Sequence, residues 1–400
     1  MGRKKRSREH GSAISDFTEA VGSSSQPYLD AAWVKEIRRK LLDWYEGACR
    51  DLPWRRDRDP YRILVSETML VQTTVAAVIP YFGRFLERFP TIQALAQAEE
   101  ADVLKAWEGL GYYRRAKQLH GAAKAVMRDH DGVIPDEPAA LIALPGIGRY
   151  ITGAILSFAF DRPEPIVEAN TQRVLARWLA IRSEVKNPAV QKQLWEAAAM
   201  LVPQAGAGAF NQAFMELGAL VCTPKSPSCL VCPVSMECRA RAMGLQDVLP
   251  VSRPKQPPLA SGEAAALVFR HGRVLIVRRK PGGLWEGFWE FPTLHVSGAN
   301  PAGRVLSNGQ LPLKEGLELL TGAKVEVGTL VKTVVYSVTK YRVTLEAYIA
   351  QGLSEPLSPG LGLDAAVWEH PERLRNHSFS SAGRKLIDSV LRLTPEIREE

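Results

Sequence analysis

Residues 222–238 read CTPKSPSCLVCPVSMEC, and this run separates a mostly helical half of the chain from a strand-rich half. It contains Cys222, Cys229, Cys232 and Cys238, with six, two and five residues between them. Four thiolates this close together can surround one metal centre, either a zinc ion or an iron–sulfur cluster. Structural zinc sites usually combine two close pairs of cysteines, which the spacer of six residues fits poorly. We therefore expect a 4Fe-4S cluster, with four unrelated buried cysteines as the alternative.

Length and composition limit the class of protein. The chain has 400 residues, of which 46% are hydrophobic, and this favours two buried cores over one. No run of about eighteen apolar residues occurs, so we expect no membrane-spanning segment and no membrane partner. The formal net charge of +8 favours a polyanionic partner such as nucleic acid, although a solvated basic surface would carry the same charge. Cysteines that must stay thiolates indicate a reducing compartment.

The hydrophobic pattern divides the chain into five segments. Residues 1–28 are basic and rich in serine, and we expect a disordered tail there. Residues 29–221 follow the helical period, and residues 222–245 form the cysteine module. A segment with prolines and lysine at 246–261 is the expected linker, and residues 262–395 change to a strand-rich pattern. The fold class expected is therefore multidomain, an all-α domain followed by an α+β domain.

Local signals place the individual elements. Asp59 and Pro60 match a helix N-cap followed by proline at the first helical position, which opens the segment that carries Glu67. Further helical patterns cover 75–89, 91–108, 114–130, 138–144, 149–159, 171–181, 188–202 and 208–221. Strand patterns cover 264–269, 274–278, 325–335 and 342–349, and a last amphipathic helix covers 381–393.

The turn Leu144-Pro145-Gly146-Ile147-Gly148 lies between two of these helical patterns. Gly146 and Gly148 allow positive φ and expose backbone N–H groups, and the next helix adds unpaired N–H groups of its own. Together these groups form a cradle for an anion such as a DNA phosphate. The turn alone is weak evidence, because most such turns only end helices. Joined to a basic chain and the four-cysteine run, it indicates a DNA-binding protein.

With these features the chain resembles adenine-specific DNA glycosylases of the MutY type, in the helix-hairpin-helix superfamily that also contains endonuclease III. The resemblance implies two helical lobes around a cleft, an iron–sulfur module and a C-terminal Nudix-like domain, and it extends over roughly residues 33–390. Besides the turn and the cysteine run, it rests on the segments at 52–55, 65–70, 108–113 and 284–292.

The resemblance assigns two carboxyl groups to the chemistry. Glu67 is the implied general acid that protonates N7 of adenine, which requires a carboxyl group that stays protonated near neutral pH. A glutamate on a helix surface is the alternative. Glu168 is the implied anion that stabilises the oxocarbenium-like sugar, and it stands where the family has aspartate. Its side chain reaches on the order of 1.5 Å further, and we expect the backbone to compensate, because Asn170 and Arg173 keep their places around it.

Tyr150 stands where the lyase-type relatives carry a nucleophilic lysine. Without that amine no Schiff base can form by the usual route, so the resemblance implies a glycosylase that does not efficiently cut the strand. We expect Tyr150 to lie close to the reacting sugar and to stabilise its positive charge. Ordinary packing in the core is the alternative.

The target adenine must be rotated out of the duplex before it can react. The resemblance assigns Gln72 and Tyr112 to filling the vacated stack near the opposite base. It places four residues around the extruded adenine or its damaged partner: Arg50, Trp54, Arg55 and Leu70. For Trp54 and Leu70, ordinary packing is an equal alternative.

The C-terminal half resembles a Nudix domain without its catalysis. Leu319 and Leu320 stand where metal-binding carboxylates would be needed, so we predict no pyrophosphatase activity. The implied role is recognition of 8-oxoguanine opposite the adenine. The family's Phe-Ser-His signature for that base is replaced by Val338-Thr339-Lys340, in which Thr339 keeps a hydroxyl group for the lesion.

The implied function is a monofunctional DNA glycosylase of base excision repair. It removes adenine mispaired with 8-oxoguanine or guanine from double-stranded DNA, as a monomer, in the cytoplasm at the bacterial nucleoid or in the nucleus or an organelle of a eukaryote. A thymine glycosylase acting on G·T mismatches shares the turn, the tyrosine and the cluster, but Glu67 and the Nudix-like half argue against it. A non-catalytic mismatch-binding protein gains support only from Glu168 and the altered recognition loop.

Overall fold

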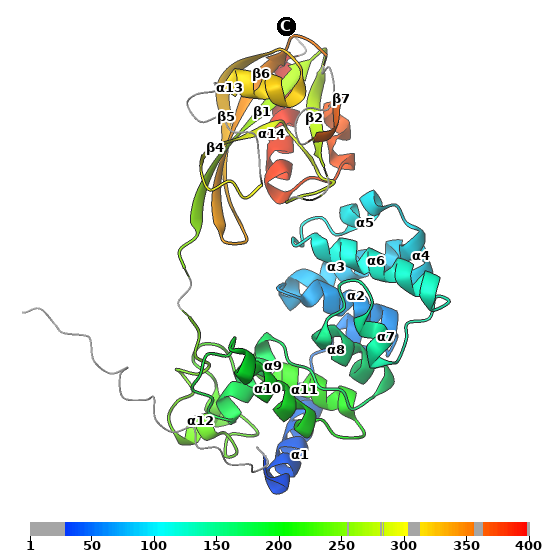
Figure 1. Ribbon diagram of the computed structural model, residues 1–400, viewed down its shortest axis with the longest axis vertical. Coiled ribbons are helices and arrows are strands. Elements are labelled where there is room, and N and C mark those ends of the chain that lie inside the picture. Colours follow the sequence, from blue (N-terminus) through cyan, green and yellow to red (C-terminus); the bar gives the residue numbers. More distant parts are fainter. Residues whose placement is uncertain are drawn as a thin grey trace, which may run out of the picture.

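The structure is a computed structural model that describes residues 29–253, 256–280, 282, 284–302, 313–355 and 363–397 (Figure 1). The disordered tail expected at residues 1–28 lies outside this range. A helical part and a C-terminal domain built on a sheet lie one above the other in this view, and the chain that joins them runs along one side. None of the described helices combines the length and the apolar character needed to cross a membrane.

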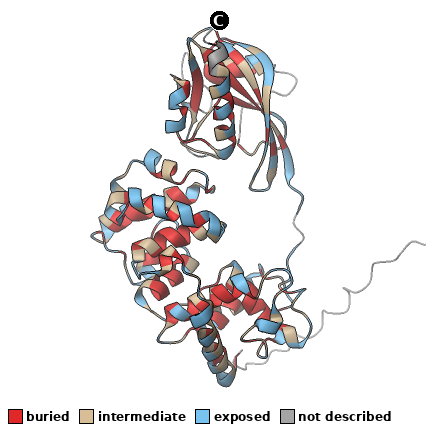
Figure 2. Cartoon of the chain, turned by 180° about the vertical axis from the view of Figure 1, so that it is seen from behind, coloured by how far each residue is buried: buried red, intermediate tan, exposed pale blue. Residues whose placement is uncertain are grey.

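Two hydrophobic cores divide the helical part into two lobes (Figure 2). The first lobe contains η1 (Pro53–Arg55), α2 (Pro60–Leu70), α3 (Val75–Arg88), α4 (Ile92–Gln97), α5 (Glu100–Ala106), α6 (Arg114–Asp129), α7 (Pro138–Ile142) and α8 (Arg149–Phe160). The second lobe contains α1 (Ala31–Ala48), α9 (Ala169–Trp178), α10 (Pro188–Leu201), α11 (Ala207–Leu220), η2 (Cys229–Val231) and α12 (Arg239–Ala242). Because α1 packs against α10 and α11, the chain crosses between the lobes both after α1 and after α8.

Side chains at helix starts fix where several of these helices begin. Asp59 accepts a hydrogen bond from the backbone N–H of Tyr61, and Pro60 is the first residue of α2, as the sequence predicts. The helical pattern expected over 91–108 is instead two helices, because the chain is extended at Ala98 and Glu99 between α4 and α5. The start of α2 matters most for function, since this helix carries Glu67.

Within the described residues, the C-terminal domain holds a seven-stranded mixed sheet in the order β3-β2-β1-β6-β5, with β4 paired to β1 and β7 paired to β2. The strands are β1 (Leu259–Arg270), β2 (Arg273–Arg279), β3 (Trp289–Glu290), β4 (Thr293–Gly298), β5 (Val325–Val338), β6 (Tyr341–Gly352) and β7 (Leu363–Glu369). β1 and β6 run parallel, whereas β1 and β2 and the hairpin of β5 and β6 are antiparallel. Because β1 begins at Leu259, the linker expected at 246–261 is too long at its C-terminal end.

Helices cover both faces of this sheet. Leu267 of β1 packs on the face covered by α14 (Ser381–Ile397), and Val268 packs on the face covered by α13 (Leu313–Thr321). The short helix η3 (Pro371–Asn376) leads into α14. Since β1 is buried on both faces, its sequence is a continuous apolar run rather than an alternating one.

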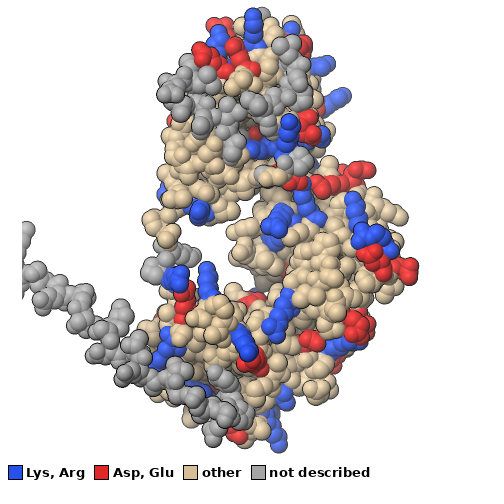
Figure 3. Space-filling view, in the orientation of Figure 1, with Lys and Arg blue, Asp and Glu red and all other residues tan. Residues whose placement is uncertain are grey.

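The C-terminal domain also contacts the first lobe at a place remote from the linker. Phe288 is buried in the core of that lobe, with its ring centre 4.3 Å from that of Tyr113. The guanidinium group of Arg384 donates to both carboxylate oxygens of Glu108, with Nη2 2.5 Å from Oε2. Between this contact and the linker the molecule is hollow, and Lys and Arg side chains border the opening (Figure 3).

Candidate active site

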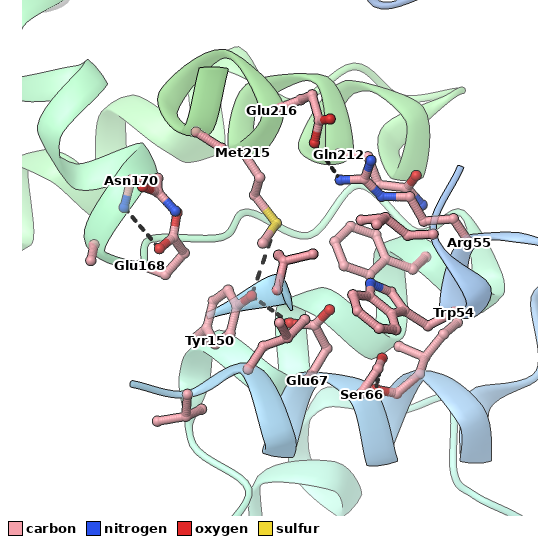
Figure 4. A pocket seen from close by; sticks show the side chains of 18 of the residues that line it. Trp54, Arg55, Ser66, Glu67, Tyr150, Glu168, Asn170, Gln212, Met215 and Glu216 are labelled. Carbon is pink, nitrogen blue, oxygen red and sulfur yellow. Dashed lines mark hydrogen bonds and ion pairs between the residues drawn. The ribbon is translucent and has the colours of Figure 1, made fainter. Parts of the chain in front are cut away.

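A cavity of about 350 Å³ lies between the two lobes. Side chains reach it from α2 and α8 of the first lobe and from α9 and α11 of the second (Figure 4). Its lining includes Arg50, Trp54, Arg55, Glu67, Leu70, Gln72, Tyr150, Glu168, Asn170, Gln212, Met215 and Glu216. The residues predicted from the sequence for catalysis and for contact with the adenine therefore line one space.

Glu67 lies on the buried side of α2 and is 3% exposed. Its Oε2 atom accepts a hydrogen bond of 2.5 Å from the hydroxyl group of Tyr150 on α8. Burial raises the pKa of Glu67 from 4.5 to about 7, while the bond from Tyr150 and the charge of Arg55 lower it in part and the charge of Glu168 adds to the rise. The side chain can therefore hold a proton at neutral pH, as a general acid must.

Tyr150 is positioned by the first turn of α8 and faces the same space. Its hydroxyl oxygen lies 3.9 Å from the sulfur of Met215, which comes from α11 of the other lobe. Burial raises the pKa of Tyr150 well above its ordinary value, and the charges of Glu67 and Glu168 add to this rise. Tyr150 therefore keeps its proton near neutral pH and can donate it in the hydrogen bond to Glu67.

Glu168 is the N-cap of α9, and its side chain forms a capping box with Thr171. Its carboxylate oxygens accept the backbone N–H groups of Asn170 at 2.8 Å and of Thr171 at 2.9 Å. Burial raises the pKa of Glu168, and these two bonds, together with the charge of Arg173, offset part of that rise. A helix N-terminus with two converging N–H groups stabilises a carboxylate. The side chain at 168 thus bonds to its own helix while it lines the cavity.

Glu216 is a residue that the sequence interpretation missed. It is fully buried on α11 and binds Arg50, with Nη2 2.9 Å from Oε2, and Arg55, with Nη2 2.8 Å from Oε2. Burial alone would raise the pKa of Glu216, but the bonds from the two arginines outweigh it and the pKa is lowered. Arg50 and Arg55 are therefore held in place by an ion pair. The sequence does contain a signal for this residue, because Glu216 is the one charged residue in the α11 sequence AGAFNQAFMELGAL.

Trp54 and Leu70 form part of the cavity wall and also pack in the first lobe. Trp54 is 6% exposed and meets the ring of Phe82 edge-on, with ring centres 5.4 Å apart. Leu70 is half-buried at the end of α2 and packs against the same core. The packing alternative is therefore confirmed for these two side chains, and because both also line the cavity, their contact with the extruded base stays a prediction.

Gln72 and Tyr112 share an unusual backbone. Both lie in the left-handed region, with φ of 59° and 48°. Gln72 follows α2 and lines the cavity, whereas Tyr112 lies in the loop before α6, is 53% exposed and is not part of the cavity lining. Residues other than glycine rarely adopt this conformation, and it is retained where the surroundings impose it.

The predicted hairpin turn is formed by α7, residues 143–148 and α8. Gly146 has φ of 75°, and a Cβ atom at this position would lie 2.5 Å from the side chain of Gln118, so the turn requires glycine. Gly148 is the N-cap of α8 and provides no side-chain cap. The first N–H groups of α8 therefore lack a side-chain acceptor and can bind an anion.

The four cysteines of the module line a second cavity, together with Arg177. Arg177 is 1% exposed, and its Nη1 atom donates to the sulfur of Cys222 at 3.2 Å and to the carbonyl of Thr223 at 2.7 Å. Across the described part of the chain, no three His, Cys, Asp or Glu side chains meet closely enough to hold one metal ion. Four thiols around one shared space fit a multi-atom cluster, which keeps its ligands apart, better than a zinc ion, which draws them to one point.

Two features of the C-terminal domain bear on its predicted role. Thr339 lies at the tip of the hairpin between β5 and β6, with φ of 52°, which is rare for a β-branched residue. Leu320 is buried in the core beneath α13, and Leu319 is 51% exposed. Neither leucine supplies an oxygen ligand to a divalent metal.

Known proteins match both domains. Residues 65–200 match the HhH-GPD superfamily base excision DNA repair proteins, and residues 264–389 match the NUDIX domain. The chain is 35% identical to an adenine DNA glycosylase of Rattus norvegicus, in an alignment that covers 90% of this chain and 79% of that protein. It is 32% identical to the adenine DNA glycosylase of Arabidopsis thaliana over 95% of this chain and 69% of that protein. It is 46% identical to that of Mycolicibacterium smegmatis over 51% of this chain and 69% of that protein.

Proposed function

The chain belongs to the adenine DNA glycosylase family, and from this we propose that it removes adenine mispaired with 8-oxoguanine or guanine in double-stranded DNA. An enzyme of this family hydrolyses an N-glycosidic bond in base excision repair. One observation carries the proposal. A buried acid that holds its proton near neutral pH, Glu67, shares a cavity with a carboxylate on the other lobe, Glu168.

The extruded adenine enters this cavity, because a base inside the stacked duplex is out of reach. Glu67 donates its proton to N7, which turns adenine into a better leaving group. The N-glycosidic bond then breaks, adenine leaves with the bonding electron pair, and Glu168 at the N-terminus of α9 stabilises the positive charge that develops on the sugar. Water adds to the sugar, and the proton that it releases returns to Glu67.

The cavity supports base removal without strand cleavage. Cutting the strand by the lyase route requires an amine that forms an imine with the sugar. The described residues that line the cavity include no lysine, and Tyr150 contributes a hydroxyl group to the lining. We therefore propose a monofunctional enzyme.

We assign recognition of the base opposite adenine to the C-terminal domain. The hairpin of β5 and β6 extends from the sheet toward the helical part, and Thr339 lies at its tip (Figure 1). The opening between the domains is bordered by basic side chains, as a duplex requires (Figure 3). A strained backbone such as that of Thr339 is typical of binding sites. The Thr339 hydroxyl is our candidate contact to 8-oxoguanine.

We propose that Cys222, Cys229, Cys232 and Cys238 hold a 4Fe-4S cluster with a structural role. Hydrolysis of a glycosidic bond consumes no electrons, so base removal requires no electron transfer by the cluster. The cluster would only hold the loop of the four cysteines in one conformation. Arg177 places a positive charge against Cys222 and bonds to the backbone of the same loop. This protein would act as a monomer, wherever DNA lies in a reducing compartment: the bacterial cytoplasm, or the nucleus or an organelle of a eukaryote.

A panel of duplexes tests the function. Each duplex carries one A·8-oxoguanine, A·G, A·T, G·T or G·U pair, and wild type is compared with Glu67→Gln. We expect adenine to be released from the first two duplexes by the wild type only, with strand breaks appearing only after alkali treatment. Release of thymine or uracil with adenine retained would identify a thymine glycosylase instead. Tight binding without release of any base would identify a mismatch-binding protein.

A further inference from the structure

Arg115 joins the two segments that carry Gln72 and Tyr112. It is buried at the start of α6, and its Nη1 atom donates to the carbonyl oxygens of Thr68 at 2.9 Å and Met69 at 2.8 Å, at the C-terminal end of α2. The remaining acceptors of the guanidinium group are the Val71 carbonyl, Thr73 Oγ1 at 3.0 Å and the Gly111 carbonyl at 3.3 Å. One planar group therefore bonds to residues on both sides of Gln72 and to the residue before Tyr112.

The positive charge of Arg115 has no acidic partner among the described residues. Its guanidinium group lies over the rings of Trp107 at 5.5 Å and Tyr112 at 5.3 Å, and its buried Nε atom has no hydrogen-bond partner. Burial lowers the pKa of Arg115 to about 10. Buried charges are ordinarily paired with an opposite charge, because burying one alone is costly. The carbonyl oxygens at the end of α2 and the two ring faces are what stabilise this cation.

The two segments that Arg115 joins are the ones with strained backbone. Gln72 and Tyr112 have positive φ, and such a conformation persists only where surrounding contacts impose it. Arg115 contacts the ring of Tyr112 directly and fixes the carbonyl groups before Gln72. Tyr112 is largely exposed, so the contact of its ring with Arg115 is a restraint on a side chain that solvent otherwise surrounds.

We propose that Arg115 is the positioning residue that holds Gln72 and Tyr112 in the arrangement that enters the duplex, and so sets how readily the adenine is extruded. The inference rests on the proposed function, in which these two residues fill the vacated stack. Arg115 touches neither the reacting base nor the sugar. Its loss should therefore impair extrusion and leave the protonation chemistry of Glu67 unchanged.

The test compares Arg115→Gln, Arg115→Lys and the control Arg114→Gln. Arg114 is the adjacent, exposed arginine on the same helix, so its replacement removes the same charge without touching the two segments. Lysine keeps the positive charge but lacks the planar guanidinium group, whose several N–H donors reach both segments. Extrusion is followed by the fluorescence of 2-aminopurine placed at the target position opposite 8-oxoguanine, and base release by single-turnover kinetics at saturating enzyme.

Both Arg115 variants should slow the fluorescence rise and the release of adenine together, by roughly a hundredfold, the effect expected of a misplacement of about 1 Å. The pH at which the rate of base release begins to fall should stay that of the wild type. Arg114→Gln should keep the wild-type fluorescence rate. An unchanged fluorescence rise in both Arg115 variants, a shifted pH profile, or an equal loss in Arg114→Gln would overturn the proposal. If wild type released no adenine at all, the proposed function would fail, while the fluorescence comparison would still decide the role of Arg115.

Discussion

Replacing Glu67 by glutamine should inactivate the protein and, at alkaline pH, stabilise it. Glutamine keeps the shape of the side chain and still accepts the hydrogen bond from Tyr150, but it has neither an acidic proton nor a negative charge. Inactivation follows from the missing proton. The burial that raises the pKa of Glu67 from 4.5 to about 7 sets the pH dependence of the wild-type rate and the size of the change in stability.

The effect on the rate follows from the fraction of protonated acid. At pH 7 a carboxyl group with a pKa of 4.5 would be protonated in roughly one molecule in 300, whereas Glu67 is protonated in about half of the molecules. The single-turnover rate of the wild type should fall about tenfold for each pH unit above this range, because only the protonated acid reacts. Glu67→Gln should lose nearly all activity at every pH.

The raised pKa of Glu67 increases the rate at neutral pH but lowers the free energy of unfolding. Below pH 4.5 the carboxyl group is protonated in both the folded and the unfolded state, so its titration changes nothing. Between pH 4.5 and about 7 the unfolded state releases this proton while the folded state retains it, so the free energy of unfolding falls as pH rises. The fall is about 1.4 kcal/mol per pH unit and about 3 kcal/mol in total, and it is complete above pH 7.

Urea unfolding at pH 5 and pH 8, followed by the circular dichroism of the helices, measures this difference. The gain in stability of Glu67→Gln over wild type should be larger at pH 8 than at pH 5 by up to about 3 kcal/mol. Glu196→Gln is the matched control, since Glu196 lies exposed on α10. A gain that is equal at the two pH values would refute the argument from burial, and a wild-type rate that stays constant from pH 7 to pH 9 would refute the general-acid role.

Three further predictions concern the neighbours of Glu67 and the domain contact. Tyr150→Phe removes a hydrogen bond that lowers the pKa of Glu67, so the alkaline fall in rate should move to higher pH in single-turnover profiles. Glu168→Asp should keep the helix cap, so thermal unfolding should show a stability within about 0.5 kcal/mol of wild type. The rate of base release should nevertheless fall by up to roughly a hundredfold, because the shorter side chain withdraws the carboxylate from the cavity. A variant faster than wild type would mean that the backbone has not compensated for the longer glutamate. Arg384→Ala should raise the radius of gyration in solution scattering, and adding Glu108→Ala should cause no further change, because the two side chains form one pair.

The sequence allowed the prediction of features that are local or that belong to a family pattern. The cap at Asp59, the turn at Gly146 and the run of cysteines each depend on residues close together in the chain. The residue at which β1 begins was harder to predict. β1 begins at Leu259 because β6, far along the chain, pairs with it from that residue onward. No periodicity within residues 246–261 contains that information.

The residues that the sequence did not reveal are those whose role depends on a partner from another element. Glu216 looks like one acid in an apolar helix until Arg50 and Arg55 are brought against it. Arg115 looks like one of two adjacent arginines, and only the packing of α6 against the end of α2 shows that it is the buried one. Such pairings are set by tertiary packing, which a local pattern does not record.

Glu216 also pairs with Arg55, the arginine whose charge opposes protonation of Glu67. The charge of Arg55 lowers the pKa of Glu67, which opposes the function of Glu67 as an acid. Glu216 binds Arg55 and Arg50 from the other lobe and provides a compensating negative charge. Glu216→Gln would leave that positive charge uncompensated next to Glu67, so the pKa of Glu67 should fall. The alkaline fall in single-turnover rate should then begin at lower pH than in wild type, the opposite direction from Tyr150→Phe, and an unshifted profile would show that Arg55 is too well screened to affect the acid.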